Sequence, residues 1–281
     1  MVVLVTGANG QLGQALQAIA PDYNEVSFYF AGSGEADITD KGTLEAIFDR
    51  LRPAFCINAA AYTAVDKAES EPETAHAVNV TGARNLAEVC KANHTTLIHI
   101  STDFVFDGQK NSPYTEEDPT NPTGVYGLTK RQGEIEIENI LPEHFIVRTS
   151  WLYSEYGNNF MKTMIRLAGE RDAISVVNDQ KGTPTNANDL AEALVGIILS
   201  GVRNYGTYHY SSEGQATWYD FAKKIFEIQK IAIDLRPIPT SAYPTPAKRP
   251  EYSVLDKSKI KTAFGLRIRD WDMALTEKEN G

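Results

Sequence analysis

The first 150 residues alternate between short apolar, β-branched runs and longer segments with helical periodicity. Repeated β-α-β units of this kind predict a parallel sheet that is covered by helices on both faces. The fold class predicted for residues 1–150 is therefore α/β, a Rossmann-like doubly wound parallel sheet. The predicted strands are 2–6, 26–30, 54–58, 96–101 and 144–150, and the predicted helices are 11–20, 43–51, 74–93 and 127–140.

After residue 150 the alternation becomes irregular. Residues 236–250 are rich in proline and are predicted to be mostly non-helical. We expect residues 151–281 to form mainly a smaller, substrate-binding part, while elements within 174–215 return to the first domain. Further helices are predicted at 158–171, 188–201 and 217–230, and a strand at 174–177.

Composition argues against several classes of protein. The formal net charge is −10, whereas a nucleic-acid-binding protein needs clustered Lys and Arg to neutralise phosphates. No apolar segment reaches the length of a membrane span, so neither a nucleic-acid nor a membrane partner is expected. Cys56 and Cys90 lack metal-ligand spacing and lie in apolar stretches, which predicts buried free thiols in a cytoplasmic protein.

The first turn of the chain carries three regularly spaced glycines, Gly7, Gly10 and Gly13, directly after the strand-like run at 2–6. Glycine permits a tight turn, a close approach of the backbone to a pyrophosphate and close packing of the helix on the strand. The helix that follows presents unpaired N–H groups and the positive end of its dipole. The pattern predicts a dinucleotide site; the alternative is a plain glycine-rich turn.

The second predicted strand ends without an acidic residue. Its end reads Ala31-Gly32-Ser33, whereas a dinucleotide fold often carries an acid there to bond the adenosine ribose. Because an acid would repel a 2′-phosphate, its absence leaves NADP(H) possible, but no Arg stands there to attract the phosphate. The choice of cofactor is therefore open at this point, with NADPH slightly favoured and NADH tolerated. Asp37 and Ile38 are candidates to lie beside the adenine; alternatively, Asp37 caps the helix that follows.

Small residues follow the third predicted strand. Ala60 and Ala61, followed by Tyr62 and Thr63, stand where the carboxyl edge of the sheet would leave room for a flat cofactor. The alternative is ordinary tight packing between a strand and a helix. Asn79, in the next predicted helix, is interpreted as a structural residue that bridges a helix to a strand, rather than as part of a proton relay.

Tyr126 and Lys130 share one face of a predicted helix, because they are four residues apart. A lysine ammonium near a phenol favours the phenolate, so Lys130 is expected to lower the pKa of Tyr126. Tyr126 would then give a proton to a ketone oxygen that receives hydride, and Lys130 would also bond a nicotinamide ribose. Taken alone, this spacing is common on surface helices.

The position of Thr102 makes the spacing of Tyr126 and Lys130 more informative. It ends the fourth predicted strand, where a side chain at the carboxyl edge of a parallel sheet points into the ligand crevice. Its hydroxyl could bond and orient a substrate carbonyl. A glycine turn, a strand-end hydroxyl and a Tyr/Lys pair together predict reduction of a carbonyl by a nicotinamide cofactor.

Seven segments, in this order, resemble the family of dTDP-4-dehydrorhamnose reductases, within the extended short-chain dehydrogenases. The likeness covers nearly the whole chain, and its glycine and YxxxK motifs mark only the wider superfamily. The segments are TGANGQLG, NAAAYTAVDKAE, STDFVFDG, VYGLTK, RTSWLY, GNNFMKTMIRLA and KRPEYSVLD.

The resemblance implies a catalytic set of Thr102, Tyr126 and Lys130 and a dTDP-sugar substrate whose C4 ketone is reduced. It implies sugar-nucleotide contacts from Thr102, Asp103 and Trp151. The cofactor contacts that it implies are Gln11, Leu12, Asp37, Ile38, Ala61, Tyr62, Thr63, Tyr126 and Lys130.

Three of the candidate substrate residues also have structural interpretations. Trp151 could stack on the sugar or base, or be a buried core aromatic. Asn159 could bond the substrate or cap the helix that begins there. Arg249 suits a diphosphate, because a guanidinium matches phosphate geometry; the alternative is a solvated loop arginine.

A metal is not expected. Some members of the family are described with magnesium bridging two subunits through carboxylates, one of them in the first helix, but here that helix reads Gln14-Ala15-Leu16-Gln17. Hard cations require carboxylate oxygens, so a magnesium-bridged dimer is not predicted, and the chain is expected to be a monomer or a homodimer.

Two other functions stay open at this stage. A sugar-nucleotide epimerase or dehydratase of the same superfamily would keep its cofactor bound and recycle the hydride. A non-catalytic regulatory subunit of methionine adenosyltransferase would bind a dinucleotide and a protein partner without turning over a sugar; the intact Thr102, Tyr126 and Lys130 set argues against it.

Overall fold

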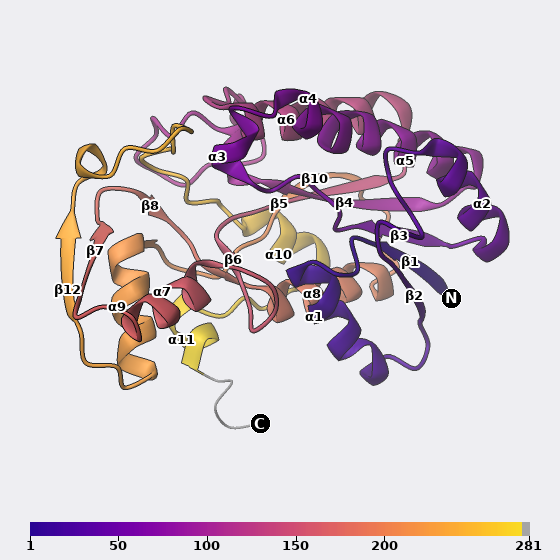
Figure 1. The fold of residues 1–281 in the computed structure, drawn as a ribbon. Coiled ribbons are helices and arrows are strands. Elements are labelled where there is room, and N and C mark those ends of the chain that lie inside the picture. The colour runs from indigo at the N-terminus through magenta and orange to yellow at the C-terminus, as the bar shows by residue number, and fades with distance from the viewer. Residues whose placement is uncertain (277–281) are drawn as a thin grey trace.

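A six-stranded, wholly parallel sheet forms the centre of the molecule (Figure 1). The computed structural model describes residues 1–276. In spatial order the strands are β2 (Ser27–Ala31), β1 (Val2–Thr6), β3 (Phe55–Asn58), β4 (Thr96–Thr102), β5 (His144–Thr149) and β10 (Gly206–His209). The inner strands β1, β3, β4 and β5 are buried almost continuously, as strands covered on both faces are, and the order of the strands confirms the predicted doubly wound α/β fold.

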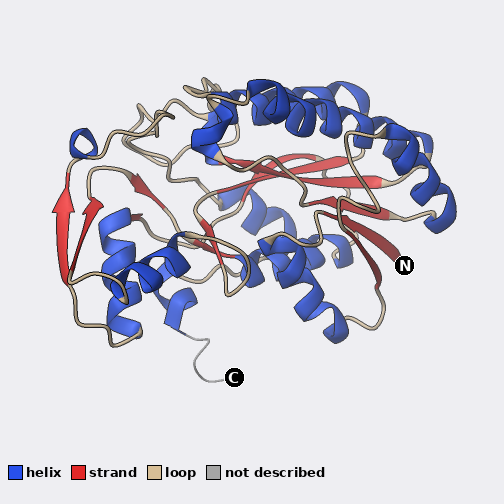
Figure 2. Cartoon of the chain, viewed as in Figure 1, coloured by secondary structure: helices blue, strands red, loops and turns tan. Residues whose placement is uncertain are grey.

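Helices cover both faces of the sheet, so that two hydrophobic cores lie on either side of it (Figure 2). One layer contains α2 (Lys41–Leu51), α5 (Gly82–Ala92) and α6 (Val125–Ile140); the other contains α1 (Gln11–Ile19), α8 (Ala187–Leu199) and α10 (Ser258–Phe264). The outer helices present an apolar stripe to the strands, whereas α8 is apolar and buried on most sides.

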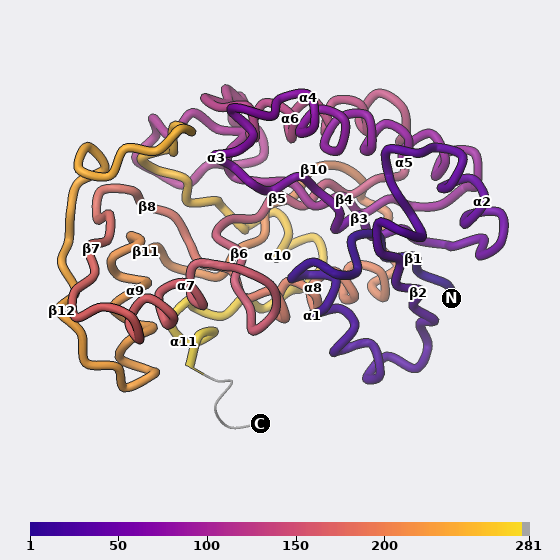
Figure 3. The backbone as a smooth tube through the Cα atoms, in the orientation of Figure 1, coloured from indigo at the N-terminus to yellow at the C-terminus, as the bar shows by residue number. Residues whose placement is uncertain are grey.

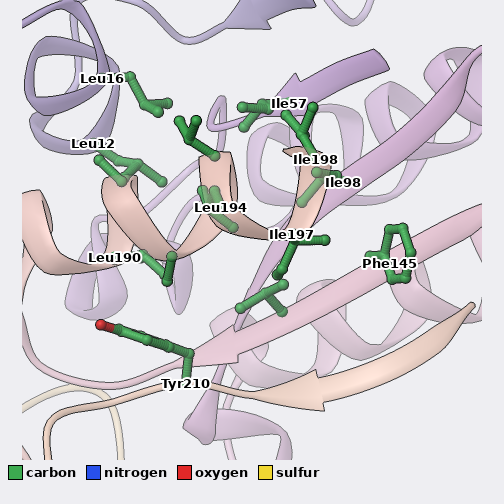
Figure 4. Close-up of a cluster of buried hydrophobic side chains, with 14 of the residues drawn as sticks. Leu12, Leu16, Ile57, Ile98, Phe145, Leu190, Leu194, Ile197, Ile198 and Tyr210 are labelled. Carbon is green, nitrogen blue, oxygen red and sulfur yellow. The ribbon is translucent and has the colours of Figure 1, made fainter. Parts of the chain in front are cut away.

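The contact between α1 and α8 builds the larger core (Figure 4). Leu16 on α1 and Leu194 on α8 are completely buried, and Ile57 and Phe145 meet them from the sheet. Burial of side chains this size contributes about 1.5–3 kcal/mol each. This packing makes α8 part of the sheet domain although it follows residue 150.

The common direction of the parallel strands determines the edge of the sheet at which the site lies. β2 and β3 pair with opposite sides of β1, so the chain reverses its direction of travel at β1. Thr6 is in register with Asn58, and Thr102 is in register with Thr149. The segments that follow β1, β3 and β4 therefore emerge along one edge, which is where doubly wound sheets bind ligands.

A smaller part extends from the sheet beyond β5 and is built from three separate two-stranded pairs and three helices (Figure 3). Its core includes Tyr153, Phe221 and Ile225. The strand pairs are β6 (Leu152–Tyr153) with β9 (Thr185–Asn186), β7 (Ala173–Val177) with β12 (Asp234–Ile238), and β8 (Lys181–Gly182) with β11 (Ala216–Thr217). The helices are α7 (Phe160–Ala168), α9 (Trp218–Ile228) and α11 (Trp271–Thr276).

Two predicted elements differ in the structure. The helix predicted at 74–93 is α4 (Pro72–His76), a π-helical turn (Ala77–Thr81) and then α5. The strand predicted at 174–177 does not join the central sheet, because β7 pairs with β12 in the smaller part; within 174–215 only α8 and β10 pack with the sheet. The segment 236–250 contains the end of β12 and one 3-10 turn, so the prediction of a mostly non-helical stretch is confirmed.

Cys56 and Cys90 are buried and form no disulfide, as predicted. Within residues 1–276, no helix combines the length and the apolar character that crossing a membrane requires.

Candidate active site

The glycine turn fits tightly between β1 and the segment after β3. Gly7 has a φ of +71°, and a Cβ there would stand 2.5 Å from the backbone nitrogen of Ala60. A Cβ on Gly13 would stand 2.5 Å from the carbonyl oxygen of Gly7. Both positions therefore require glycine, and their close packing brings the N-terminus of α1 to the switch point of the sheet.

The start of α1 has the character of an anion site. Gly10 is its N-cap and supplies no side-chain cap, and the first turn contains no acidic residue. The first N–H groups of a helix lack intrahelical partners and lie at the positive end of its dipole. Residues 10–13 therefore fit the pyrophosphate of a dinucleotide.

Asn79 holds the segment that follows β3. Its Oδ1 accepts from the backbone nitrogen of Tyr62 at 2.9 Å, and its Nδ2 donates to the carbonyl of Tyr62 and to Thr129 Oγ1. Asn79 thus makes structural contacts, but it joins its helix to the segment after β3 and to α6, not to a strand as predicted. The Tyr62 hydroxyl donates to Glu71 at 2.6 Å, and cofactor contacts from Ala60, Ala61, Tyr62 and Thr63 stay predictions.

Asp37 forms a local turn by accepting from the backbone nitrogen and hydroxyl of Thr39. The interpretation of Asp37 as a helix cap is wrong, because Asp40 caps α2 by accepting from Gly42 and Thr43. Ile38 is buried, and its side chain fills the space that a Cβ on Gly82 would need. Because Asp37 does not cap a helix, its position beside the adenine stays the prediction for this residue.

A third glycine brings Tyr126 to the end of β4. A Cβ on Gly127 would stand 2.1 Å from the carbonyl oxygen of Phe104, so only glycine lets α6 approach this closely. The rings of Tyr126 and Phe104 meet edge to face with centroids 5.6 Å apart. Thr102 Oγ1 accepts from the Phe104 backbone nitrogen and donates to Asp103 Oδ1 at 3.1 Å.

Tyr126 is a weaker acid than expected. Burial raises its pKa to about 12, the nearby charge of Asp103 also raises it, and a hydrogen bond with Thr102 only partly offsets this. The prediction that Lys130 lowers the pKa of Tyr126 is wrong for this arrangement. The Lys130 Nζ donates to the carbonyl of Ile100 at 2.7 Å instead. Sharing a helix face did not bring the ammonium to the phenol, because Lys130 reaches into the sheet.

Lys130 is itself perturbed by its surroundings. It is 2% exposed, and burial lowers its pKa to about 8 against the opposing effect of the Glu134 carboxylate. Its Nζ also lies 3.3 Å from Nε2 of His99. An amine with this pKa can change its charge near neutral pH.

Sequence reasoning missed a buried ion pair behind Lys130. Glu134 is completely buried and accepts from Arg148 Nε at 2.9 Å and Nη2 at 2.8 Å. Burial alone would raise the pKa of Glu134, but the hydrogen bonds and charge of Arg148 outweigh it, and the pKa is lowered. The spacing Lys130/Glu134 was a signal, since residues four apart on a helix are neighbours.

The proposed substrate residues have partners within the protein. Trp151 stacks on Trp218 with centroids 3.6 Å apart. Arg249 lies in a loop, is 25% exposed and pairs with Asp66 at 2.8 Å, so it is an ion-paired loop arginine. Asn159 caps α7, which confirms the capping interpretation; its role toward a substrate stays a prediction, as do those of Trp151 and Arg249.

Gln11 joins the two parts of the molecule. Its side-chain oxygen accepts from Asn159 Nδ2 at 2.8 Å and from the Ser154 hydroxyl at 3.1 Å. A residue in the first turn of α1 is thus bonded to the loop before α7. The candidate cofactor and substrate regions are in direct contact through it.

Burial of the Asp103 carboxylate destabilises the folded chain in a way that can be predicted. It is 1% exposed, and burial raises its pKa to about 6, opposed by hydrogen bonds from Ser253 and Thr102. The folded chain therefore holds this proton more tightly than the unfolded chain, and the contribution of Asp103 to stability falls as pH rises from about 4 to about 6. We expect Asp103→Asn to stabilise the fold by about 2–3 kcal/mol at pH 7.5 and by little at pH 4. Urea unfolding at both pH values measures this; an equal effect at both would contradict it.

The family model described as the RmlD substrate binding domain matches residues 1–279. The dTDP-4-dehydrorhamnose reductase of Aggregatibacter actinomycetemcomitans is 44% identical, with 97% of this chain and 96% of the relative covered. No group of three or more potential metal-ligating side chains occurs in the described chain, and the expectation of no metal stays a prediction.

Two solved structures match over nearly their whole length. A dTDP-4-dehydrorhamnose reductase from Clostridium acetobutylicum is 42% identical with a TM-score of 0.95, covering 99% of this chain and 98% of that one. The Bacillus anthracis dTDP-4-dehydrorhamnose reductase, in complex with NADP, is 40% identical with a TM-score of 0.93, covering 98% and 96%. The chain therefore belongs to the dTDP-4-dehydrorhamnose reductase family of oxidoreductases.

Proposed function

We propose that the protein reduces the C4 ketone of dTDP-4-dehydro-L-rhamnose to dTDP-L-rhamnose with NADPH. Membership of the reductase family supports the reaction class. One observation carries the proposal: the glycine turn, Thr102 and the Tyr126/Lys130 helix face converge at one edge of the parallel sheet. The NADP complex of the Bacillus anthracis relative supports the choice of NADPH.

The start of α1 would hold the pyrophosphate, and residues 60–63 together with Asp37 and Ile38 would flank the rest of the dinucleotide. When bound, NADPH supplies the hydride. Lys130 would bond the nicotinamide ribose, because its Nζ lies at the carboxyl end of β4 beside Ile100. No residue in the first turn of α1 brings a negative charge against the phosphates.

Thr102 would orient the ketone, and Tyr126 would give its hydroxyl proton to the oxygen that becomes an alkoxide. A phenol whose pKa is raised to about 12 stays protonated at neutral pH, and an alkoxide is more basic than a phenolate, so the transfer is downhill. The hydrogen bond between Thr102 and Tyr126 lowers the pKa of the phenol. The Thr102 hydroxyl, which donates to Asp103 in the free protein, would turn toward the phenolate that is left and stabilise it.

The smaller part would bind the sugar nucleotide through Asp103, Trp151, Asn159 and Arg249. The stack of Trp151 on Trp218 gives a rigid aromatic surface. Arg249 would meet a diphosphate while its guanidinium is paired with Asp66, so its contribution would be geometric more than electrostatic.

The test follows NADPH and NADH oxidation while dTDP-4-dehydrorhamnose is generated in place. We expect stoichiometric oxidation, faster with NADPH than with NADH, and release of dTDP-L-rhamnose. Purified protein that carries NAD and converts sugar nucleotides without net oxidation would contradict the proposal in favour of an epimerase or dehydratase. Absence of turnover together with capture of a methionine adenosyltransferase catalytic subunit would favour a regulatory subunit instead.

A further inference from the structure

A chain of buried polar side chains leads from the first strand to Lys130. Thr6 Oγ1 donates to Asn58 Oδ1 at 2.8 Å, Asn58 Nδ2 lies 3.0 Å from His99 Nδ1, and His99 Nε2 lies 3.3 Å from Lys130 Nζ. All four residues are at most 2% exposed. Polar groups this deeply buried must match donor to acceptor at every step.

A backbone N–H group fixes which atom donates and which accepts in this series of hydrogen bonds. The Ala60 N–H can only donate, and it donates to Asn58 Oδ1 at 3.1 Å. Rotating the amide of Asn58 would set two donors against each other at that contact. The Asn58 NH₂ group therefore faces His99, and His99 Nδ1 must accept.

The tautomer of His99 follows. A neutral imidazole that accepts at Nδ1 carries its proton at Nε2, and this N–H is aimed at Lys130. An ammonium on Lys130 would face it donor to donor. A neutral amine would instead accept from Nε2–H and still donate to the carbonyl of Ile100.

We propose that His99 is a positioning residue whose Nε2–H favours the neutral, hydrogen-bond-accepting form of Lys130 and aims the amine along the edge of the sheet. The positioning of Lys130 by His99 goes beyond the proposed function. Only the effect of this positioning on catalysis rests on the proposed function. A lysine held in this way has to be charged, and turned away from His99, before it can act as a cation beside Tyr126.

The surrounding charges are consistent with the arrangement. Glu134, on α6, favours the ammonium, but burial outweighs it and lowers the pKa of Lys130 to about 8, so the neutral amine becomes the majority form above about pH 8. Burial, with smaller effects of Lys130 and of His144 on β5, holds the pKa of His99 well below its usual value. The contacts from β1 and β3 are the neutral side chains of Thr6 and Asn58.

Nitrogen-15 NMR of the histidine rings, without added nucleotide, tests the tautomer directly. The other buried histidines serve as internal references: Nδ1 of His144 contacts the carbonyl of Leu141 at 2.5 Å, and Nδ1 of His209 contacts the carbonyl of Tyr114 at 3.1 Å. A carbonyl can only accept, so both must be Nδ1–H. We expect His99 alone among the three to be Nε2–H. An Nδ1–H or doubly protonated His99 at pH 9, above the pKa of Lys130, would overturn the proposal.

Two variants test the link to Lys130, whose charge is followed by the carbon-13 shift of its ε-carbon. His99→Asn retains an acceptor for Asn58 but does not reach Lys130, and it should raise the pKa of Lys130 by about one unit or more, a tenfold change in the protonation constant. His144→Asn, the control, should leave it unchanged. An unchanged Lys130 titration in His99→Asn would overturn the proposal.

Asn58→Asp reverses the donor and acceptor roles along this series of hydrogen bonds while it keeps the imidazole of His99. A carboxylate facing Nδ1 draws the His99 proton to that atom, leaving Nε2 to accept from an ammonium. The His99 tautomer should therefore switch, the Lys130 pKa should rise, and the alkaline limit of kcat/KM should move upward. Retention of neutral Nε2–H would overturn the proposal. These NMR results do not depend on the sugar, so a failed reductase assay would refute the proposed function alone.

Discussion

Tyr126→Phe is expected to reduce turnover by about 10²–10⁴-fold, the range for loss of a general acid. The variant keeps the ring that packs edge to face on Phe104 but removes the proton that would be given to the ketone oxygen. NADPH affinity should be nearly unchanged, because the glycine turn and the start of α1 are untouched. Steady-state oxidation of NADPH with generated substrate, together with fluorescence titration of NADPH, measures both quantities.

Tyr205→Phe is the matched control for this variant. Tyr205 precedes β10, at the amino end of that strand, and packs on Phe145, away from the edge where Thr102 lies. It should retain wild-type turnover. Near-normal oxidation of NADPH by Tyr126→Phe would rule out Tyr126 as the proton donor.

Arg148→Met should cost about 3 kcal/mol of unfolding free energy at pH 7.5, at the lower end of the range for breaking a buried ion pair. The substitution leaves the completely buried Glu134 with a single remaining ion pair, to Arg131 at 3.0 Å. The control, Arg166→Met, breaks an exposed pair with Glu170 and should cost less than about 1 kcal/mol. Urea unfolding of both variants measures the difference.

The loss in Arg148→Met should also depend on pH. Arg148 lowers the pKa of Glu134 in the folded chain, so its stabilising effect is present above the unfolded pKa and disappears as pH falls through the folded value. The difference between wild type and Arg148→Met should therefore shrink at pH 4. A difference that grows in acid, or that equals the effect of Arg166→Met, would show that the pair does not act in this way.

Hydrophobic and glycine patterns were sufficient to predict the sheet domain. The run at 2–6 followed by Gly7, Gly10 and Gly13 marks a strand, a tight turn and a helix, because each of these depends on local residues. The helix predicted at 74–93 is continuous, but the wider turn within it could not be predicted in this way. Its π-helical turn contains Asn79, whose carbonyl oxygen would be 2.1 Å from a Cβ on Gly133 of α6. That close approach is a tertiary contact, and local helical preference does not report it.

Local sequence likewise predicted one part of the candidate site and not the other. Spacing alone placed Tyr126 and Lys130 on one face and Thr102 at a strand end. It could not show that Lys130 reaches His99, or that Arg148 neutralises Glu134, because these partners come from β4 and β5 at a distance in sequence. The parallel pairing of β7 with β12 was hidden for the same reason, since residues 173–177 and 234–238 are far apart in the chain.

The bond between Gln11 and Asn159 bears on attempts to redirect the enzyme to other sugars by exchanging its C-terminal part for that of a relative. A cut at residue 150 would separate Gln11, in the first turn of α1, from its donors Ser154 and Asn159. Groups in contact do not contribute independently, so such a chimera would inherit mismatched halves. A transplanted segment should bring residues 7–13 with it, even though they lie at the opposite end of the gene.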